Sequence, residues 1–198
     1  MYVNKFVNPR LSSNSYIITY GRHAFVIDPG NADPIIEYLF VNGLSLDAVL
    51  FTHAHADHCY GLVKLMEAFA PSKIYCSKHA VEIFGSERAN GSLYMEIPFE
   101  IDATGFAFVE EGSEIHTAEG STLKVIETPG HNRDCVSFHI EKYLFTGDAM
   151  IPNKKVFTRT LYGDKRIAAD SVQRIVSEFP ADTIICPGHG EMCYLRAC

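Results

Sequence analysis

The segment that decides the fold is Asp47-Ala48-Val49-Leu50-Phe51-Thr52-His53-Ala54-His55-Ala56-Asp57-His58. Its first half is apolar and predicts a strand over residues 47–52. Its second half holds four side chains that bind divalent metals, separated only by alanines. Imidazole and carboxylate are ligands for zinc or iron, and the absence of thiolate argues against a closed structural zinc site. A histidine-rich surface loop is the alternative that the rest of the sequence must decide.

Three later segments repeat one design, in which an apolar strand meets a glycine-containing turn and a metal-binding side chain follows. These side chains are His131, Asp148 and His189. Glycine lets the backbone turn sharply, and a strand end aims a ligand better than a flexible loop. Each junction alone is also explained as an ordinary turn. Together the four junctions predict seven metal ligands: His53, His55, Asp57, His58, His131, Asp148 and His189. Seven ligands suit two metals better than one, and two-metal hydrolytic sites hold their ions roughly 3.5–4 Å apart.

Composition limits the classes of protein that the chain can represent. With 198 residues, 47% hydrophobic and 21% charged, we expect one globular domain over residues 1–198. The net charge of −7 gives no basic footprint for nucleic acid or an anionic membrane. The sequence has no membrane-spanning apolar stretch and no signal peptide, so we expect a cytoplasmic protein with its six cysteines reduced. The oligomeric state is not predicted.

Periodicity predicts mixed sheets with helices packed outside them. One helix is expected over Asp33–Asn42, with Asp33 as its N-cap and Gly43 as its stop. A second is expected to end before Pro71, and its core face is Leu62, Leu65, Met66 and Phe69. The segment from Gly85 to about Gly105 lacks a clear pattern, and a connection of this length is often a functional loop.

At this point the chain resembles the metallo-β-lactamase superfamily, and within it the small glyoxalase II-like hydrolases. The resemblance covers nearly the whole chain, and its motifs are Asn14-Ser15-Tyr16, Val26-Ile27-Asp28-Pro29-Gly30, Thr52–His58, Thr128-Pro129-Gly130-His131, Phe145-Thr146-Gly147-Asp148 and Pro187-Gly188-His189-Gly190. It implies an α+β fold, a four-layer αββα sandwich of two mixed sheets with helices outside and the metals at one edge. Because residue 55 is His and not Glu, the chain resembles the hydrolytic branch and not the flavodiiron oxidoreductases.

The resemblance also implies how the ligands divide. His53, His55 and His131 would hold the first metal, Asp57, His58 and His189 the second, and Asp148 would bridge them. Zinc is expected, with iron or manganese as alternatives. A metal-bound hydroxide would attack the acyl carbon of a small-molecule substrate. Asp57 would also orient the water or carry a proton, and Asp28 would support the ligands or occupy a turn.

Two departures from the family pattern concern substrate recognition. Arg133 and Asp134 stand where small residues are usual, so Arg133 would either contact an anionic substrate or pair locally with Asp134. Only nine residues follow His189, where glyoxalase II has a further helical segment that helps to hold glutathione, so we do not expect glutathione specificity from the motifs. Arg159, Tyr162 and Lys165 are candidates for substrate contact or ordinary surface residues. Cys59 is expected to be a small residue beside the site, with a catalytic thiol as the alternative.

The leading hypothesis is therefore a dinuclear zinc hydrolase, glyoxalase II-like, that acts on a small thioester or ester. A mononuclear iron persulfide dioxygenase is a second hypothesis, because that branch shares the motifs. A lactonase or another hydrolase of the same fold is a third. A non-catalytic metal-binding protein is a fourth, and the complete set of ligands speaks against it.

Overall fold

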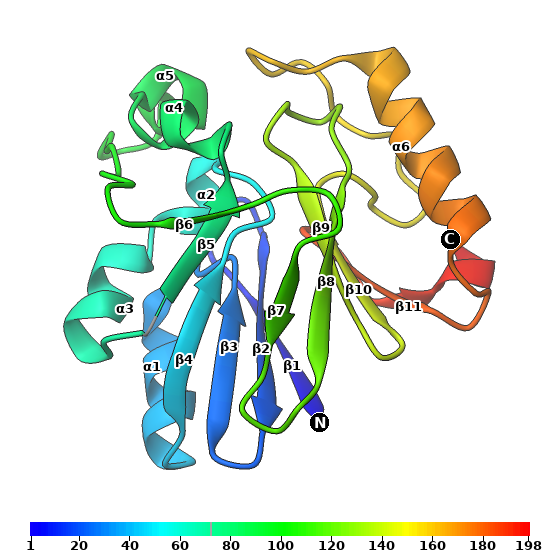
Figure 1. Cartoon of the computed structure of the whole chain (residues 1–198). Helices are drawn as coiled ribbons and strands as arrows, with labels where there is room; N and C mark the ends of the chain where they lie inside the picture. Colours follow the sequence, from blue (N-terminus) through cyan, green and yellow to red (C-terminus); the bar gives the residue numbers. More distant parts are fainter. Residues whose placement is uncertain (72) are drawn as a thin grey trace.

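Two six-stranded mixed β-sheets face each other in the computed structural model, which describes residues 1–71 and 73–198 (Figure 1). The first sheet has the strand order β1-β2-β3-β4-β5-β6, and the second has the order β12-β11-β10-β9-β8-β7. The strands are β1 Tyr2–Val7, β2 Asn14–Tyr20, β3 His23–Ile27, β4 Ser45–Leu50, β5 Lys73–Ser77, β6 Ala107–Val109, β7 Glu114–His116, β8 Thr122–Glu127, β9 Val136–Ile140, β10 Tyr143–Gly147, β11 Ile184–Pro187 and β12 Cys193–Tyr194.

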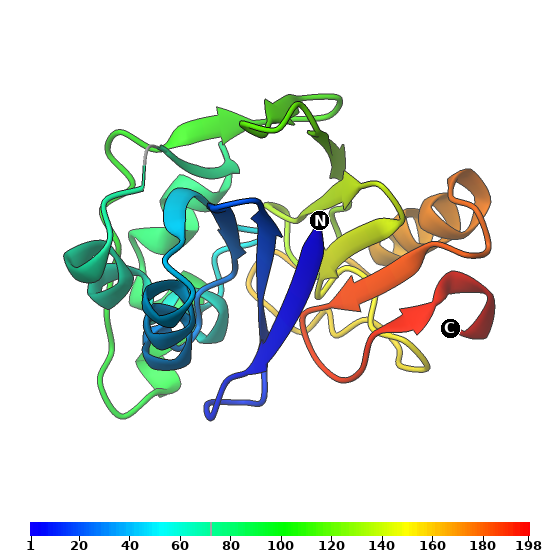
Figure 2. The same ribbon diagram turned by 90° about the horizontal axis from the view of Figure 1, so that it is seen from below.

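Helices cover the outer faces of both sheets, which completes four layers (Figure 2). The α-helices are α1 Ala32–Val41, α2 Ala56–Cys59, α3 Leu62–Ala68, α4 Ala80–Phe84, α5 Glu87–Asn90 and α6 Lys165–Glu178, and the 3₁₀ helices are η1 Ser92–Tyr94 and η2 Leu195–Ala197. Helices α1 and α3 pack on the first sheet and α6 packs on the second. The predicted αββα sandwich is confirmed.

The central strands are apolar on both faces because each face meets a different layer. In β3, Val26 packs toward the helices of the first sheet, whereas Ile27 packs between the sheets. Val49 and Leu50 divide in the same way in β4. Strands buried on both faces have nearly continuous apolar sequences, which is why the run before His53 predicts its strand. That strand is β4, and it ends at Leu50, two residues earlier than expected.

The strands that lead to the later candidate ligands share one direction. β8 and β10 both pair antiparallel with β9, and β11 pairs parallel with β10. Their carboxyl ends therefore lie at the same edge of the second sheet, and His131, Asp148 and His189 follow there.

Two details of the helices differ from the sequence prediction. The N-cap of α1 is Asn31 and not Asp33, because the Asn31 side chain accepts a hydrogen bond from the Asp33 amide. Asp33 lies inside the first turn and pairs with Lys64 of α3. On α3, Leu62 and Leu65 are buried as expected, but Met66 is 44% exposed and does not belong to the core.

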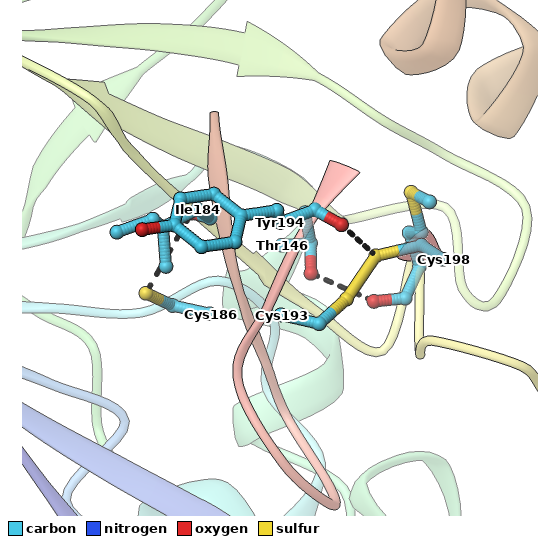
Figure 3. The surroundings of a disulfide bond; sticks show 7 residues. Thr146, Ile184, Cys186, Cys193, Tyr194 and Cys198 are labelled. Carbon is cyan, nitrogen blue, oxygen red and sulfur yellow. Dashed lines mark hydrogen bonds between the residues drawn. A yellow bond between two sulfur atoms is a disulfide. The ribbon is translucent and has the colours of Figure 1, made fainter. Parts of the chain in front are cut away.

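The cysteines also differ from the expectation that all six are reduced. Cys193 and Cys198 form a disulfide that joins β12 to the residue after η2 (Figure 3). They come together because η2 turns the chain back, while the backbone of Leu195 donates to the Thr183 carbonyl at 2.8 Å. Cys59, Cys76, Cys135 and Cys186 are buried and free. No helix within residues 1–71 and 73–198 has the length and apolar character to cross a membrane.

Gly130 offers a direct test of how tightly the site edge packs against α6. Its φ of +130° is unfavourable for other residues, and a Cβ there would collide with the backbone of Ala168. We predict that Gly130→Ala lowers the free energy of unfolding by about 2–4 kcal/mol, measured by chemical denaturation. Gly105→Ala is the control, because Gly105 also has a positive φ but open space around it. Equal losses in the two variants would contradict the packing argument.

Candidate metal centre

The seven predicted ligands meet at one end of the sandwich, in two groups of three with a carboxylate between them. Each group has ligand atoms within 4.8 Å of one another. The first group is His53, His55 and His131, and the second is Asp57, His58 and His189. Nε2 of His131 lies 2.8 Å from Nδ1 of His55, so the two nitrogens share a proton or a cation.

Asp148 lies between the two groups. Its Oδ2 is 3.7 Å from Nε2 of His131 and 3.5 Å from Nε2 of His189, and its Oδ1 is 3.6 Å from Nε2 of His58. The neighbouring Gly188 leaves the room for this arrangement, because a Cβ there would collide with Asp148 and lie 2.8 Å from the His58 ring. A carboxylate in contact with both groups is placed where it can bridge two cations.

Asp28 fixes the orientation of two of these histidines. Nδ1 of His58 donates to Asp28 at 3.0 Å, and the Thr52 hydroxyl donates to the same carboxylate oxygen at 2.6 Å. Because that hydroxyl proton is used, Thr52 Oγ1 accepts from Nδ1 of His53, at 3.0 Å. The Thr52 amide donates to the other Asp28 oxygen at 2.8 Å. Both imidazoles therefore direct Nε2 toward the site.

Several buried polar atoms in this cluster have no hydrogen-bond partner among the described residues. They include Nε2 of His53, Nε2 of His58 and Oδ1 of Asp148. An unpaired polar group in a buried position is costly, and bound cations would give these three atoms partners. Asp28, His53 and His58 also lie within ligand distance of one another. Asp28 is occupied by its bonds to Thr52 and His58, so this trio is not a third site.

The electrostatics of the cluster also suit cations. Burial lowers the pKa of His53, and it lowers the pKa of His55 to about 3 with the help of neighbouring His131. Both imidazoles are therefore neutral and can act as ligands. Burial opposes ionisation of Asp57, but His58 and His189 prevail and lower its pKa. Burial also opposes charge on His58, yet the carboxylates, Asp57 foremost, raise its pKa to about 10. Such a field attracts positive charge.

His131 is held by its own backbone partner. Its Nδ1 donates to the Phe157 carbonyl at 2.6 Å, so its Nε2 faces the site. The Thr160 hydroxyl donates to the His131 carbonyl at 2.8 Å. The segment between Asp148 and α6 therefore supports a candidate ligand as well as lining the space above it.

Of the two roles considered for Arg133, a contact to an anionic substrate or a pair with Asp134, the pair does not form. Asp134 is buried, and its Oδ2 accepts a hydrogen bond from the Ala54 amide at 2.7 Å. This bond anchors the segment 53–58. Burial raises the pKa of Asp134 to about 7. Arg133 pairs instead with Glu82 of α4 and lies over the Tyr162 ring, with Cζ 3.9 Å from the centroid. Tyr162 donates to Glu82 at 2.6 Å, so these three residues tie α4 to the segment before α6.

Cys59 takes the structural role that the sequence favoured. Its side chain is buried next to the segment 53–58, and burial raises the pKa of its thiol well above the usual value. A thiol that stays protonated is a poor nucleophile.

An open cleft of about 740 Å³ lies over the cluster. His55, Asp57, His131, Asp148 and His189 line its floor. One wall comes from α5 and η1 within the segment 85–105, which therefore borders the site as expected of a functional loop. The other wall comes from residues 151–161, including Arg159. Figure 1 shows α5 and the segment before α6 at the same end of the sandwich. Tyr162 and Lys165 are not part of the lining.

Residues 8–189 match the Lactamase_B family, described as the Metallo-beta-lactamase superfamily. This match spans most of the chain, and the chain belongs to that superfamily.

The chain is similar to curated proteins and to solved structures. The hydroxyacylglutathione hydrolase of Aeromonas salmonicida is 30% identical over 174 residues, which are 88% of this chain and 59% of that protein. The chain thus spans about three fifths of the length of this curated relative. Among solved structures, BLEG-1 B3 metallo-beta-lactamase has a TM-score of 0.90 and 24% identity, over 99% of this chain and 95% of that one. TTHA1623 in a di-iron-bound form has a TM-score of 0.86 and 23% identity, over 98% and 96%. These structures share the fold.

The role of Asp28 leads to a prediction about metal affinity. In Asp28→Asn, the new amide would donate where His58 and Thr52 now donate, so the two imidazoles lose their fixed orientation. We predict a 10- to 100-fold loss of zinc affinity, measured by competition with a chromophoric chelator. Asp182→Asn is the control, because Asp182 is exposed and lies outside the cluster. Unchanged affinity in Asp28→Asn would show that Asp28 does not orient the ligands.

Proposed function

We propose that the chain is a dinuclear metal-dependent hydrolase that cleaves a small acyl thioester. His53, His55 and His131 would hold one ion, Asp57, His58 and His189 the other, and Asp148 both. The observation that carries this proposal is a set of buried atoms without hydrogen-bond partners among the described residues, namely Nε2 of His53, Nε2 of His58 and Oδ1 of Asp148, the last two 3.6 Å apart. Five imidazoles and two carboxylates without thiolate suit zinc, which we take as the metal, and iron is the alternative.

Bound metal ions of this kind lower the pKa of a water molecule and polarise a carbonyl oxygen. The chain's own contribution is positioning. Asp57 lines the cleft floor, and its Oδ2 lies 3.3 Å from Nε2 of His189 and 3.5 Å from Nε2 of His58. Its lowered pKa keeps it ionised at neutral pH, so its carboxylate can orient a water molecule by accepting a hydrogen bond from it.

The cleft walls favour an acyl group next to this centre. Large apolar side chains line them, among them Leu11, Tyr94, Ile151, Phe157 and Leu161. Apolar walls around a few polar groups are typical of small-molecule sites. The relatives named hydroxyacylglutathione hydrolase support a thioester as the bond that is cleaved.

Two further statements belong to this proposal. We take residues 1–198 as one domain, because strands from both sheets contribute to a shared core between them. We take the cytoplasm as the site of action, because four of the six cysteines are buried free thiols, although the disulfide between Cys193 and Cys198 is of a kind that is rare in that compartment.

Replacing the carboxylate between the two groups tests the mechanism. We predict that Asp148→Ala lowers the kcat for thioester hydrolysis by more than about a hundredfold and lowers the number of bound zinc ions, because the two groups lose their common ligand. Thioester cleavage is followed with a thiol reagent, and metal by elemental analysis. Asp182→Ala is the control. An unchanged kcat for thioester hydrolysis in Asp148→Ala would contradict the mechanism.

Metal content separates this proposal from the persulfide dioxygenase. We predict two zinc ions per chain and hydrolysis without oxygen uptake. One iron per chain, with oxygen consumed in the presence of glutathione persulfide, would favour the dioxygenase instead. Removal of the metals with a chelator should abolish hydrolysis, and added zinc should restore it.

A further inference from the structure

Three consecutive carbonyl groups in the turn between β8 and β9 accept hydrogen bonds from α6 and the segment before it. The carbonyls of residues 129–131 accept from the Ser171 hydroxyl, the Asp164 amide and the Thr160 hydroxyl, in that order, at 2.6, 2.9 and 2.8 Å. Residues 128–135 belong to no helix or strand. The position of the turn therefore depends on these bonds and not on the ladder of a sheet.

The bond from Thr160 acts on a candidate metal ligand itself. His131 is 3% exposed, and among the described residues the Thr160 hydroxyl is the one donor to its carbonyl. The ring of His131 is held from the same side, because its Nδ1 donates to the Phe157 carbonyl at 2.6 Å. One short segment thus holds both the ring and the backbone of this residue. Loss of the only donor to a buried carbonyl is costly, so the turn would shift to find another partner.

The same turn reaches a second candidate ligand. Asn132 is buried, and its amide nitrogen lies 3.2 Å from Nε2 of His55. Nε2 of His131 lies 2.8 Å from Nδ1 of the same ring. Two of the three imidazoles in the first group therefore depend on where the turn lies. The second group is supported differently, because His58 donates to Asp28.

We propose that Thr160 is a positioning residue for the first metal-holding group, His53, His55 and His131. Its hydroxyl fixes the turn that carries His131, and the turn in turn limits the place of His55. Hydrogen bonds that orient metal ligands contribute to metal affinity. This inference rests on the proposed metal centre and goes beyond it, because it gives a role to a side chain outside the seven ligands and requires the two groups to respond differently.

Two parent variants isolate the two groups for the test. His189→Ala removes a ligand of the second group, so the first group is measured alone, and His55→Ala does the reverse. Zinc affinity is measured by competition with a chromophoric chelator. Thr160→Val keeps the shape of threonine without its hydroxyl. We predict that it lowers zinc affinity about tenfold in the His189→Ala parent and by less than about twofold in the His55→Ala parent.

Further variants make the test specific to the hydroxyl. Thr160→Ser keeps the donor and should bind zinc nearly as tightly as its parent. Thr158→Val is the matched control, because Thr158 lies on the same segment but outside the cleft lining, and its hydroxyl does not bond to the turn. If Thr160→Val does not fold, Thr160→Ala takes its place with the same expected loss. An unchanged affinity, an equal loss in both parents or in Thr158→Val, or a loss in Thr160→Ser would overturn the inference.

Thr160 also lines the cleft, so contact with the substrate is the competing role. The kinetics of the chain with all seven ligands separate the two. For a positioning residue, the kcat of Thr160→Val falls when zinc is limiting, and added zinc restores most of it. A raised KM together with an unchanged zinc affinity would assign Thr160 to the substrate and contradict the inference.

Zinc affinity also separates this inference from the proposed function. If no thioester is cleaved but Thr160→Val weakens zinc binding by the first group alone, the hydrolase fails and the positioning role stands. If thioesters are cleaved and Thr160→Val binds zinc as its parent does, the hydrolase stands and the positioning role fails.

Discussion

The candidate metal centre depends on the hydrogen bonds that the buried Asp28 carboxylate accepts. This carboxylate accepts hydrogen bonds from the Thr52 amide, the Thr52 hydroxyl and Nδ1 of His58. Through Thr52 it also fixes the ring of His53. One buried group thus holds the end of β4 and sets the direction of two imidazole lone pairs. A cation bound by these imidazoles would offset the free-energy cost of burying so many polar atoms in one place.

Much of the fold and site could be predicted because the signals are local. Strands such as β3 and β4 are apolar on both faces, and each candidate ligand follows its strand by a few residues, so sequence order alone indicates that the ligands meet. The division into two triplets comes from resemblance, and the ligand atoms of each triplet lie within 4.8 Å of one another. The sequence offers Asp28 a supporting role or a place in a turn. It does not indicate that Asp28 accepts hydrogen bonds from both Thr52 and His58, because these partners are 24 and 30 residues away.

Other features depend on contacts that a linear pattern does not contain. Asp134 follows Arg133 directly, which suggests an ion pair between the two. Its hydrogen-bond partner is instead the amide of Ala54, 80 residues away. Arg133 instead meets Glu82 and Tyr162, which places it in a tie between α4 and the segment before α6. Met66 fits the helical period but extends beyond the edge of the packed face. The bond between Cys193 and Cys198 depends on a turn that spacing does not announce.

The central claim is that two ions share one carboxylate at this edge of the sandwich. Anomalous diffraction from crystals of the zinc-loaded protein tests it most directly. The account predicts two peaks roughly 3.5–4 Å apart, one among His53, His55 and His131 and one among Asp57, His58 and His189, with the Asp148 carboxylate between them. A single peak, or ions bound away from these side chains, would contradict it.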